Sequence, residues 1–79
     1  MENLTILSDV FAGSLNIARE RIDDGLTYNT IPEWDSVAHM ALVASLESAF
    51  DIMLDTDDIV DMSSFAKAKN ILEKHNIVF

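Results

Sequence analysis

Residues 35–50 read DSVAHMALVASLESAF and form the clearest helical pattern in the chain. Val43, Leu46 and Phe50 recur at positions i, i+3 and i+7, which places three large apolar side chains on one face of a helix. Asp35 or Ser36 supplies a side-chain oxygen that can cap the first turn. The stretch therefore predicts an amphipathic helix over residues 36–50.

A second helix is predicted upstream, over residues 4–15. Asn3 or Thr5 can cap its start, and Asn16 can end it in a left-handed conformation. Its apolar positions have helical spacing: Leu4, Leu7, Phe11 and Leu15. No period holds over residues 17–35, so we expect a long loop there that is held on the core by scattered apolar side chains: Ile22, Leu26, Tyr28 and Ile31.

Downstream of residue 50 the pattern predicts two further helices. Thr56, followed by two acids, indicates the start of a short helix that runs to about residue 61. Ser63 or Ser64 can cap a last helix that runs to about residue 75. Its buried face is predicted to contain Phe65, Ala68, Ile71 and Leu72. The sequence thus predicts an all-α fold, a small four-helix bundle with a long first loop and a short third helix, in one domain over residues 1–79.

Composition supports a small packed domain. The chain has 79 residues, 49% of them hydrophobic, and only two glycines and one proline, a mixture that favours helices. It has no cysteine, which excludes disulfides and thiolate metal sites. Because neither a signal-peptide pattern nor a long apolar run is present, we expect a cytoplasmic protein that does not insert into membranes. We also expect it to be a monomer.

The charge distribution indicates which partners to expect. Net charge is −9, and no Lys or Arg lies between Arg21 and Lys67. The acids in that interval are Asp23, Asp24, Glu33, Asp35, Glu47, Asp51, Asp55, Asp57, Asp58 and Asp61. Such a field repels nucleic acids and anionic membranes and attracts basic protein surfaces. We therefore expect no nucleic-acid binding.

Where the long loop meets the helix over 36–50, residues 33–40 read EWDSVAHM. At this point the chain resembles the acyl carrier protein family, whose attachment motif is Asp-Ser-Leu followed by an amphipathic helix. The resemblance covers nearly the whole chain, because the helices, the long loop, Asp35-Ser36 and Phe50-Asp51 come in the order and spacing of the family. It implies a four-helix fold of the acyl carrier type and a carrier that is not itself an enzyme.

The resemblance also implies a cofactor and its site. Ser36 would be the attachment point of 4′-phosphopantetheine donated by coenzyme A, with Asp35 orienting the attachment step. The thiol of the arm would carry acyl groups as thioesters, which suits a chain without cysteine. The acyl chain would fold into a cleft among the helices, for which the expected lining residues are Val43, Leu46, Met62, Ala68 and Ile71. No metal site is expected.

The residues themselves leave two interpretations of Ser36 open. A serine in the first turn of a helix lies where unpaired N–H groups and the positive end of the dipole favour an attached phosphate. Alternatively, Ser36 only caps its helix.

Partners implied by the resemblance are a phosphopantetheinyl transferase and acyl-loading and acyl-transfer enzymes with basic docking patches. The residues expected to contact them are Trp34, Val37, Met40, Glu47, Asp57 and Asp58. Trp34 can instead pack the loop onto the bundle. The helix departs from fatty-acid-synthesis carriers at Ala38 and Ala41, where the family has acids, so the resemblance favours a specialised biosynthetic pathway.

Two rival functions remain open from the sequence: an aminoacyl or peptidyl carrier, and a helical interaction domain without a cofactor. Of the two histidines, His39 is expected to be a solvated helical residue. His75 is expected to interact mildly with the end of its helix.

Overall fold

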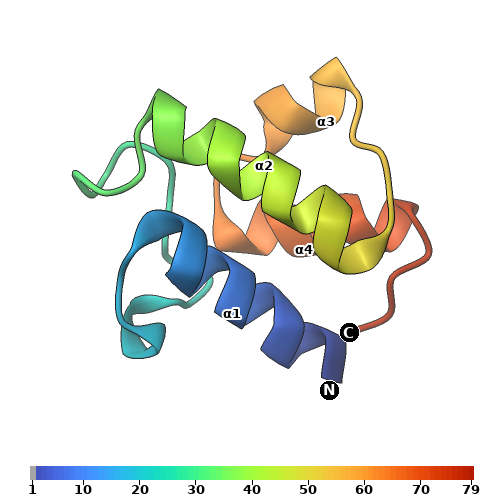
Figure 1. The fold of residues 1–79 in the computed structure, drawn as a ribbon, viewed down its shortest axis with the longest axis horizontal. Helices are drawn as coiled ribbons and strands as arrows, with labels where there is room; N and C mark the ends of the chain where they lie inside the picture. Colours follow the sequence, from blue (N-terminus) through green and yellow to red (C-terminus); the bar gives the residue numbers. More distant parts are fainter. Residues whose placement is uncertain (1) are drawn as a thin grey trace.

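The structure is a computed structural model that describes residues 2–79. Its elements are α1 (Glu2–Leu15), the 3-10 turn η1 (Arg19–Arg21), α2 (Ser36–Phe50), α3 (Thr56–Asp61) and α4 (Phe65–Lys74). Figure 1 shows α1 and α2 side by side, with the short α3 at the edge of the bundle. Within residues 2–79 there is no strand, only an isolated bridge between Thr27 and Ser64. The prediction of a small all-α fold with four helices, the third short, is confirmed.

Helices α2 and α4 each begin directly after a residue whose side chain caps the first turn. Asp35 caps α2, with its side chain accepting from the Ala38 N–H, and Ser64 caps α4 in the same way through the Lys67 N–H. Helix α1 begins earlier than predicted, so Asn3 and Thr5 lie inside it and do not cap it. Asn3 instead donates from Nδ2 to the Val78 carbonyl at 2.9 Å, which links the two ends of the described chain.

Left-handed residues end several of these segments. Asn16 follows α1 with φ of 56°, as predicted, and Asp51 follows α2 with φ of 54°. Asn29, in the long loop, and Asn76, after α4, have φ of 63° and 68°. Side chains of this kind tolerate the left-handed region better than other residues do.

The core forms from one face of each long helix. The predicted faces of α2 and α4 are buried, except that Phe50 is only half-buried and that Leu42 joins the α2 face. Leu4 of α1 is 36% exposed and lies at the rim, whereas the other three predicted positions of this helix are buried. The fully buried side chains of largest volume are Trp34, Phe11, Leu7, Leu15, Leu42, Leu46, Met62 and Leu72.

The long loop is pinned to the helices by both side chains and backbone. Leu26 is buried, and its carbonyl accepts from the Phe65 N–H at 3.0 Å, while the Tyr28 N–H donates to the Ser63 carbonyl at 2.8 Å. These bonds join the loop to the segment after α3 and to the first residue of α4. Residues 19–21, predicted as loop, form the short turn η1. None of the described helices is long and apolar enough to cross a membrane.

Trp34 is the chain's single tryptophan and is 0% exposed, so its fluorescence reports directly on the loop. We expect blue-shifted emission and slow quenching by iodide in the native protein, with both properties lost in the urea-unfolded protein. Native emission at the position of a water-exposed indole would contradict the packing described here.

Candidate functional site

Ser36 occupies the first turn of α2 and is exposed to solvent. The cap of this helix is Asp35, whose Oδ1 accepts from the Ala38 N–H at 2.8 Å. The Ser36 hydroxyl makes no hydrogen bond within residues 2–79. The interpretation in which Ser36 only caps its helix is therefore wrong, because Asp35 already does this.

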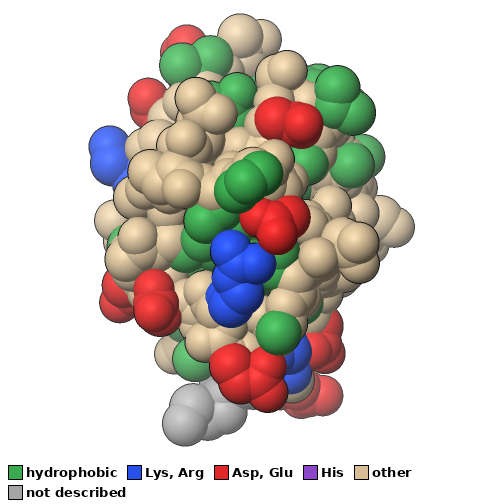
Figure 2. All heavy atoms as spheres, turned by 90° about the vertical axis from the view of Figure 1, so that its left-hand side faces the viewer, with side chains coloured by type: hydrophobic (Ala, Val, Ile, Leu, Met, Phe, Trp, Pro, Cys, Tyr) green, Lys and Arg blue, Asp and Glu red, His purple; other side chains and the backbone are tan. Residues whose placement is uncertain are grey.

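The surface next to Ser36 is apolar. Val37 is 79% exposed and Met40 is 57% exposed, while Ala41 is also exposed. Both large side chains are therefore accessible, as the prediction that they contact a partner requires. Figure 2 views the molecule from the side at which α2 begins and shows exposed hydrophobic side chains among acidic ones, with few basic ones.

Trp34 is not part of this surface, and its assignment as a partner contact is corrected. It is fully buried and makes edge-to-face contacts with Phe11, with ring centroids 5.5 Å apart, and with Tyr28, at 6.0 Å. Burying an indole removes about 150–250 Å² from water, worth on the order of 5 kcal/mol, a large fraction of the stability of a small domain. The alternative interpretation, in which Trp34 packs the loop onto the bundle, describes what the structure shows.

Two of the acids predicted to bind partners have internal partners. Asp58 is 4% exposed and forms an ion pair with the more exposed Lys74, so its assignment as a surface contact is corrected. Glu47 is half-buried, and its Oε2 accepts from the Leu54 N–H at 2.9 Å, which holds the segment between α2 and α3. Asp57 remains exposed in the first turn of α3.

His39 joins three parts of the chain. Its Nδ1 accepts from the Trp34 indole Nε1–H at 3.0 Å, and its Nε2 lies 2.9 Å from the Ile59 carbonyl. Because an indole nitrogen only donates, Nδ1 must be the acceptor and Nε2 must carry the proton that is donated to Ile59. The ring thus connects the long loop and α2 to α3.

The expectation that His39 is a solvated helical residue is wrong. The sequence did contain a signal, because His39 lies four and seven positions before Val43 and Leu46, on the buried stripe of the helix.

A cavity of about 220 Å³ lies beside this link. Its lining residues come from the long loop, α2, α3 and the segment that follows α3: Tyr28, His39, Ile59, Val60, Met62 and Ser63. Of the residues expected to line a cleft among the helices, only Met62 borders this cavity. Val43, Leu46, Ala68 and Ile71 are buried in the packed core, 0–4% exposed.

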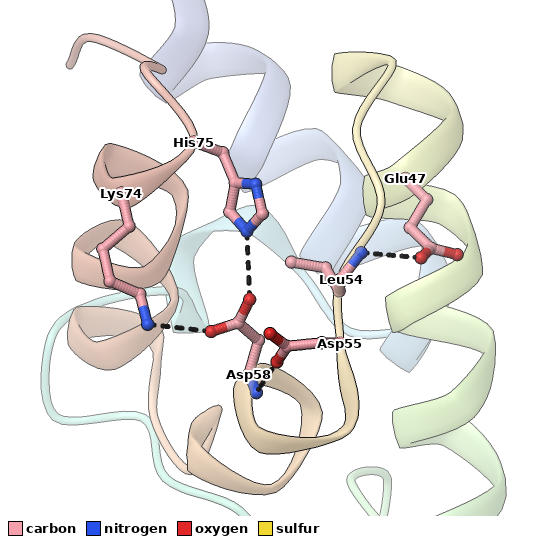
Figure 3. Close-up of polar contacts among 6 residues, drawn as sticks. All are labelled: Glu47, Leu54, Asp55, Asp58, Lys74 and His75. Atoms are coloured by element: carbon pink, nitrogen blue, oxygen red, sulfur yellow. Dashed lines mark hydrogen bonds and ion pairs between the residues drawn. The ribbon is translucent and has the colours of Figure 1, made fainter.

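Helix α3, with six residues, is held by polar side chains (Figure 3). Asp55 caps it through the Asp58 N–H at 2.8 Å. The Asp58 carboxylate lies between α3 and the end of α4, accepting from Lys74 Nζ at 2.9 Å and lying 3.0 Å from His75 Nε2. His75 therefore anchors α3, a role that sequence reasoning missed.

These contacts shift the pKa values of the Asp58 carboxyl group and the Lys74 ammonium group. Hydrogen bonds from Lys74 and then from His75 hold the pKa of Asp58 below its ordinary value, despite burial. The same bond raises the pKa of Lys74. At the other end of the molecule the pKa of Glu33 is lowered, chiefly by its own backbone N–H and then by Arg21, whose Nη1 lies 3.1 Å from Oε2.

Most basic side chains are used in ion pairs away from Ser36. Arg19 pairs with Asp9 at 2.7 Å, and Lys69 pairs with Asp24 at 2.6 Å. Of the acids on α3 and its flanks, only Asp58 has an ion-pair partner among residues 2–79. The acids without such a partner are Asp51, Asp55, Asp57 and Asp61. No group of three or more His, Cys, Asp or Glu in the described part of the chain is arranged to hold a metal ion.

Comparisons with protein-family models, with curated proteins and with solved structures give no match.

Asp58→Asn should lower the free energy of unfolding by about 1–2 kcal/mol at pH 7, because hydrogen bonds to a charged group are weakened at a buried position. The folded-state pKa of Asp58 is depressed, so its contribution is present above the ordinary carboxyl pKa of about 4 and is lost as pH falls through the folded value. Urea unfolding of both proteins from pH 7 to pH 2 measures this. The difference should shrink below pH ~4, and a difference that stays constant to pH 2 would contradict the pairing.

His39→Phe should destabilise the protein by about 1–3 kcal/mol, because it leaves the buried Trp34 N–H and the Ile59 carbonyl without partners. Amide hydrogen exchange should accelerate most in α3. Met40→Phe, at an exposed position on the same helix, is the matched control. Equal protection of the α3 amides in His39→Phe and the wild type would show that the ring does not anchor this helix.

Proposed function

We propose that this chain is a carrier protein that holds acyl intermediates as thioesters on a 4′-phosphopantetheine arm attached to Ser36. One observation carries the proposal. The Ser36 hydroxyl is exposed and without a hydrogen bond in the described chain, at a helix start whose capping is already performed by Asp35. A serine hydroxyl that neither caps the helix nor bonds to another described residue can be modified without loss of a structural contact.

The residues around Ser36 fit a phosphodiester. The N–H groups at the start of a helix have no intrahelical acceptor, and the positive end of the dipole favours a negative group there. Asp35 stands beside the hydroxyl, where its charge can orient the transferase that attaches the arm. When bound, the arm supplies the thiol that this chain lacks.

The surface around Ser36 supports presentation to other proteins. Val37 and Met40 give an exposed apolar contact within one turn of the attachment point. Unpaired acids on and around α3, among them Asp57, provide charge for enzymes with basic docking patches. Ala38 and Ala41 leave the start of α2 without acids, which favours partners of a specialised biosynthetic pathway over those of general fatty-acid synthesis.

Incubation with coenzyme A and a broad-specificity phosphopantetheinyl transferase should add one phosphopantetheine, seen by intact mass spectrometry. Ser36→Ala should abolish the gain, because it removes the accepting hydroxyl. Ser48→Ala, an exposed serine on the same helix, should be modified as the wild type is.

Two outcomes would contradict the proposal. A gain that persists in Ser36→Ala would refute the assignment of the site. No gain on a folded wild-type protein would instead support a helical interaction domain without a cofactor.

A further inference from the structure

The hydrogen bonds of His39 are compatible with only one charge state of its ring. Nδ1 accepts from the Trp34 indole Nε1–H at 3.0 Å, and Nε2 donates to the Ile59 carbonyl oxygen at 2.9 Å. Both bonds need the neutral ring, with its single proton on Nε2. Protonation would place a second N–H on Nδ1, so that two donors would face each other with no acceptor between them.

The surroundings of the two rings decide which one moves when His39 becomes charged. Trp34 is 0% exposed and packs edge-to-face against Phe11 and Tyr28, so that moving the indole would open the close-packed core. The His39 side chain is only half-buried and borders the cavity beside α3. The charged ring is therefore the one that turns towards solvent, and in turning it leaves both Trp34 and Ile59.

A charged His39 would gain no ion pair in its native position, because within residues 2–79 no carboxylate oxygen lies within 4.0 Å of its ring nitrogens. Tyr28, from the long loop, faces the ring with its own ring, at a centroid distance of 5.3 Å. The Asp35 carboxylate caps α2, and the Asp58 carboxylate is turned towards α4. The other acids of α3 and its cap are exposed, so they attract a positive ring outwards: Asp55, Asp57 and Asp61.

We propose that His39 is a pH-sensitive switch that links the long loop and α2 to α3 when neutral and releases this link when protonated. The core packing and the pairing of Asp58 with α4 persist in both states, so the change is local. A histidine ordinarily changes charge between about pH 8 and pH 5, where ordinary carboxyl groups stay ionised. The inference does not depend on the proposed carrier function.

The test follows the single tryptophan indole N–H and the His39 ring nitrogens by ¹H–¹⁵N NMR over the range from about pH 8 to pH 5. At the basic end, His39 should show the tautomer protonated at Nε2. As the pH falls, the Trp34 indole signal should shift with the same midpoint as the His39 ring.

Exchange of the indole proton with water gives a second measurement. Its rate is divided by that of N-acetyltryptophanamide at the same pH, which removes the intrinsic effect of pH on exchange. At the acidic end of the range this ratio should be about fivefold higher than at the basic end, as expected for the loss of one typical hydrogen bond.

Two variants separate His39 from the rest of the protein. His39→Gln keeps a donor and an acceptor but cannot become charged, so its Trp34 indole signal should not shift over the same range. His75→Gln removes the other histidine of the chain, whose Nε2 lies 3.0 Å from Asp58, and it should leave the response of Trp34 as in the wild type.

An indole signal that does not change with pH in the wild type would overturn the inference. A response that persists in His39→Gln, or that disappears in His75→Gln, would do the same. If His39→Gln does not fold, the wild-type spectra decide alone, because different midpoints for the His39 ring and the Trp34 indole, or a neutral ring protonated at Nδ1, would also overturn it. The loading of Ser36 is a separate measurement, so either proposal can fail without the other.

Discussion

The buried indole N–H of Trp34 is the constraint on which the arrangement around Ser36 depends. A donor enclosed in the core costs free energy unless an acceptor is placed within reach, and the acceptor is Nδ1 of His39. Accepting there commits the other ring nitrogen to donate, and it does so to the Ile59 carbonyl. One donor that must be satisfied thus sets the positions of the long loop, the start of α2 and the middle of α3.

Within the six consecutive residues 34–39, some side chains hold the fold together and others are left exposed for chemistry. Trp34 fills the core, Asp35 caps the helix, and His39 links to α3. Ser36 and Val37 between them are left exposed. The proposed carrier function would need such a division, because a modified Ser36 would have to reach several enzymes in turn while the fold beneath it stays fixed. The same division places a small cavity within one turn of the serine.

Local signals in the sequence were sufficient for the helices but not for the contacts between them. The caps Asp35 and Ser64 and the apolar stripes located α2 and α4 closely, because capping and periodicity act over a few residues. Trp34 was predicted either to contact a partner or to pack the loop onto the bundle, and Asp58 to contact a partner, because nothing in their neighbourhood along the chain decides between exposure and burial. Burial of the Asp58 carboxylate is possible because Lys74 and His75 provide hydrogen-bond donors for it. These two residues lie 16 and 17 positions away along the chain, so only the packed structure shows that they are its partners.

The left-handed residues that end helices and turns in this protein are Asn16, Asn29, Asp51 and Asn76, and none of them is glycine. Glycine would adopt these angles at lower cost in the native state but would also give the unfolded chain more conformations to lose. At these angles asparagine and aspartate are somewhat more strained than glycine in the native state, but they leave the unfolded chain with fewer conformations. These four residues therefore contribute to the stability of this small protein through the unfolded state, because they lower its conformational entropy relative to glycine.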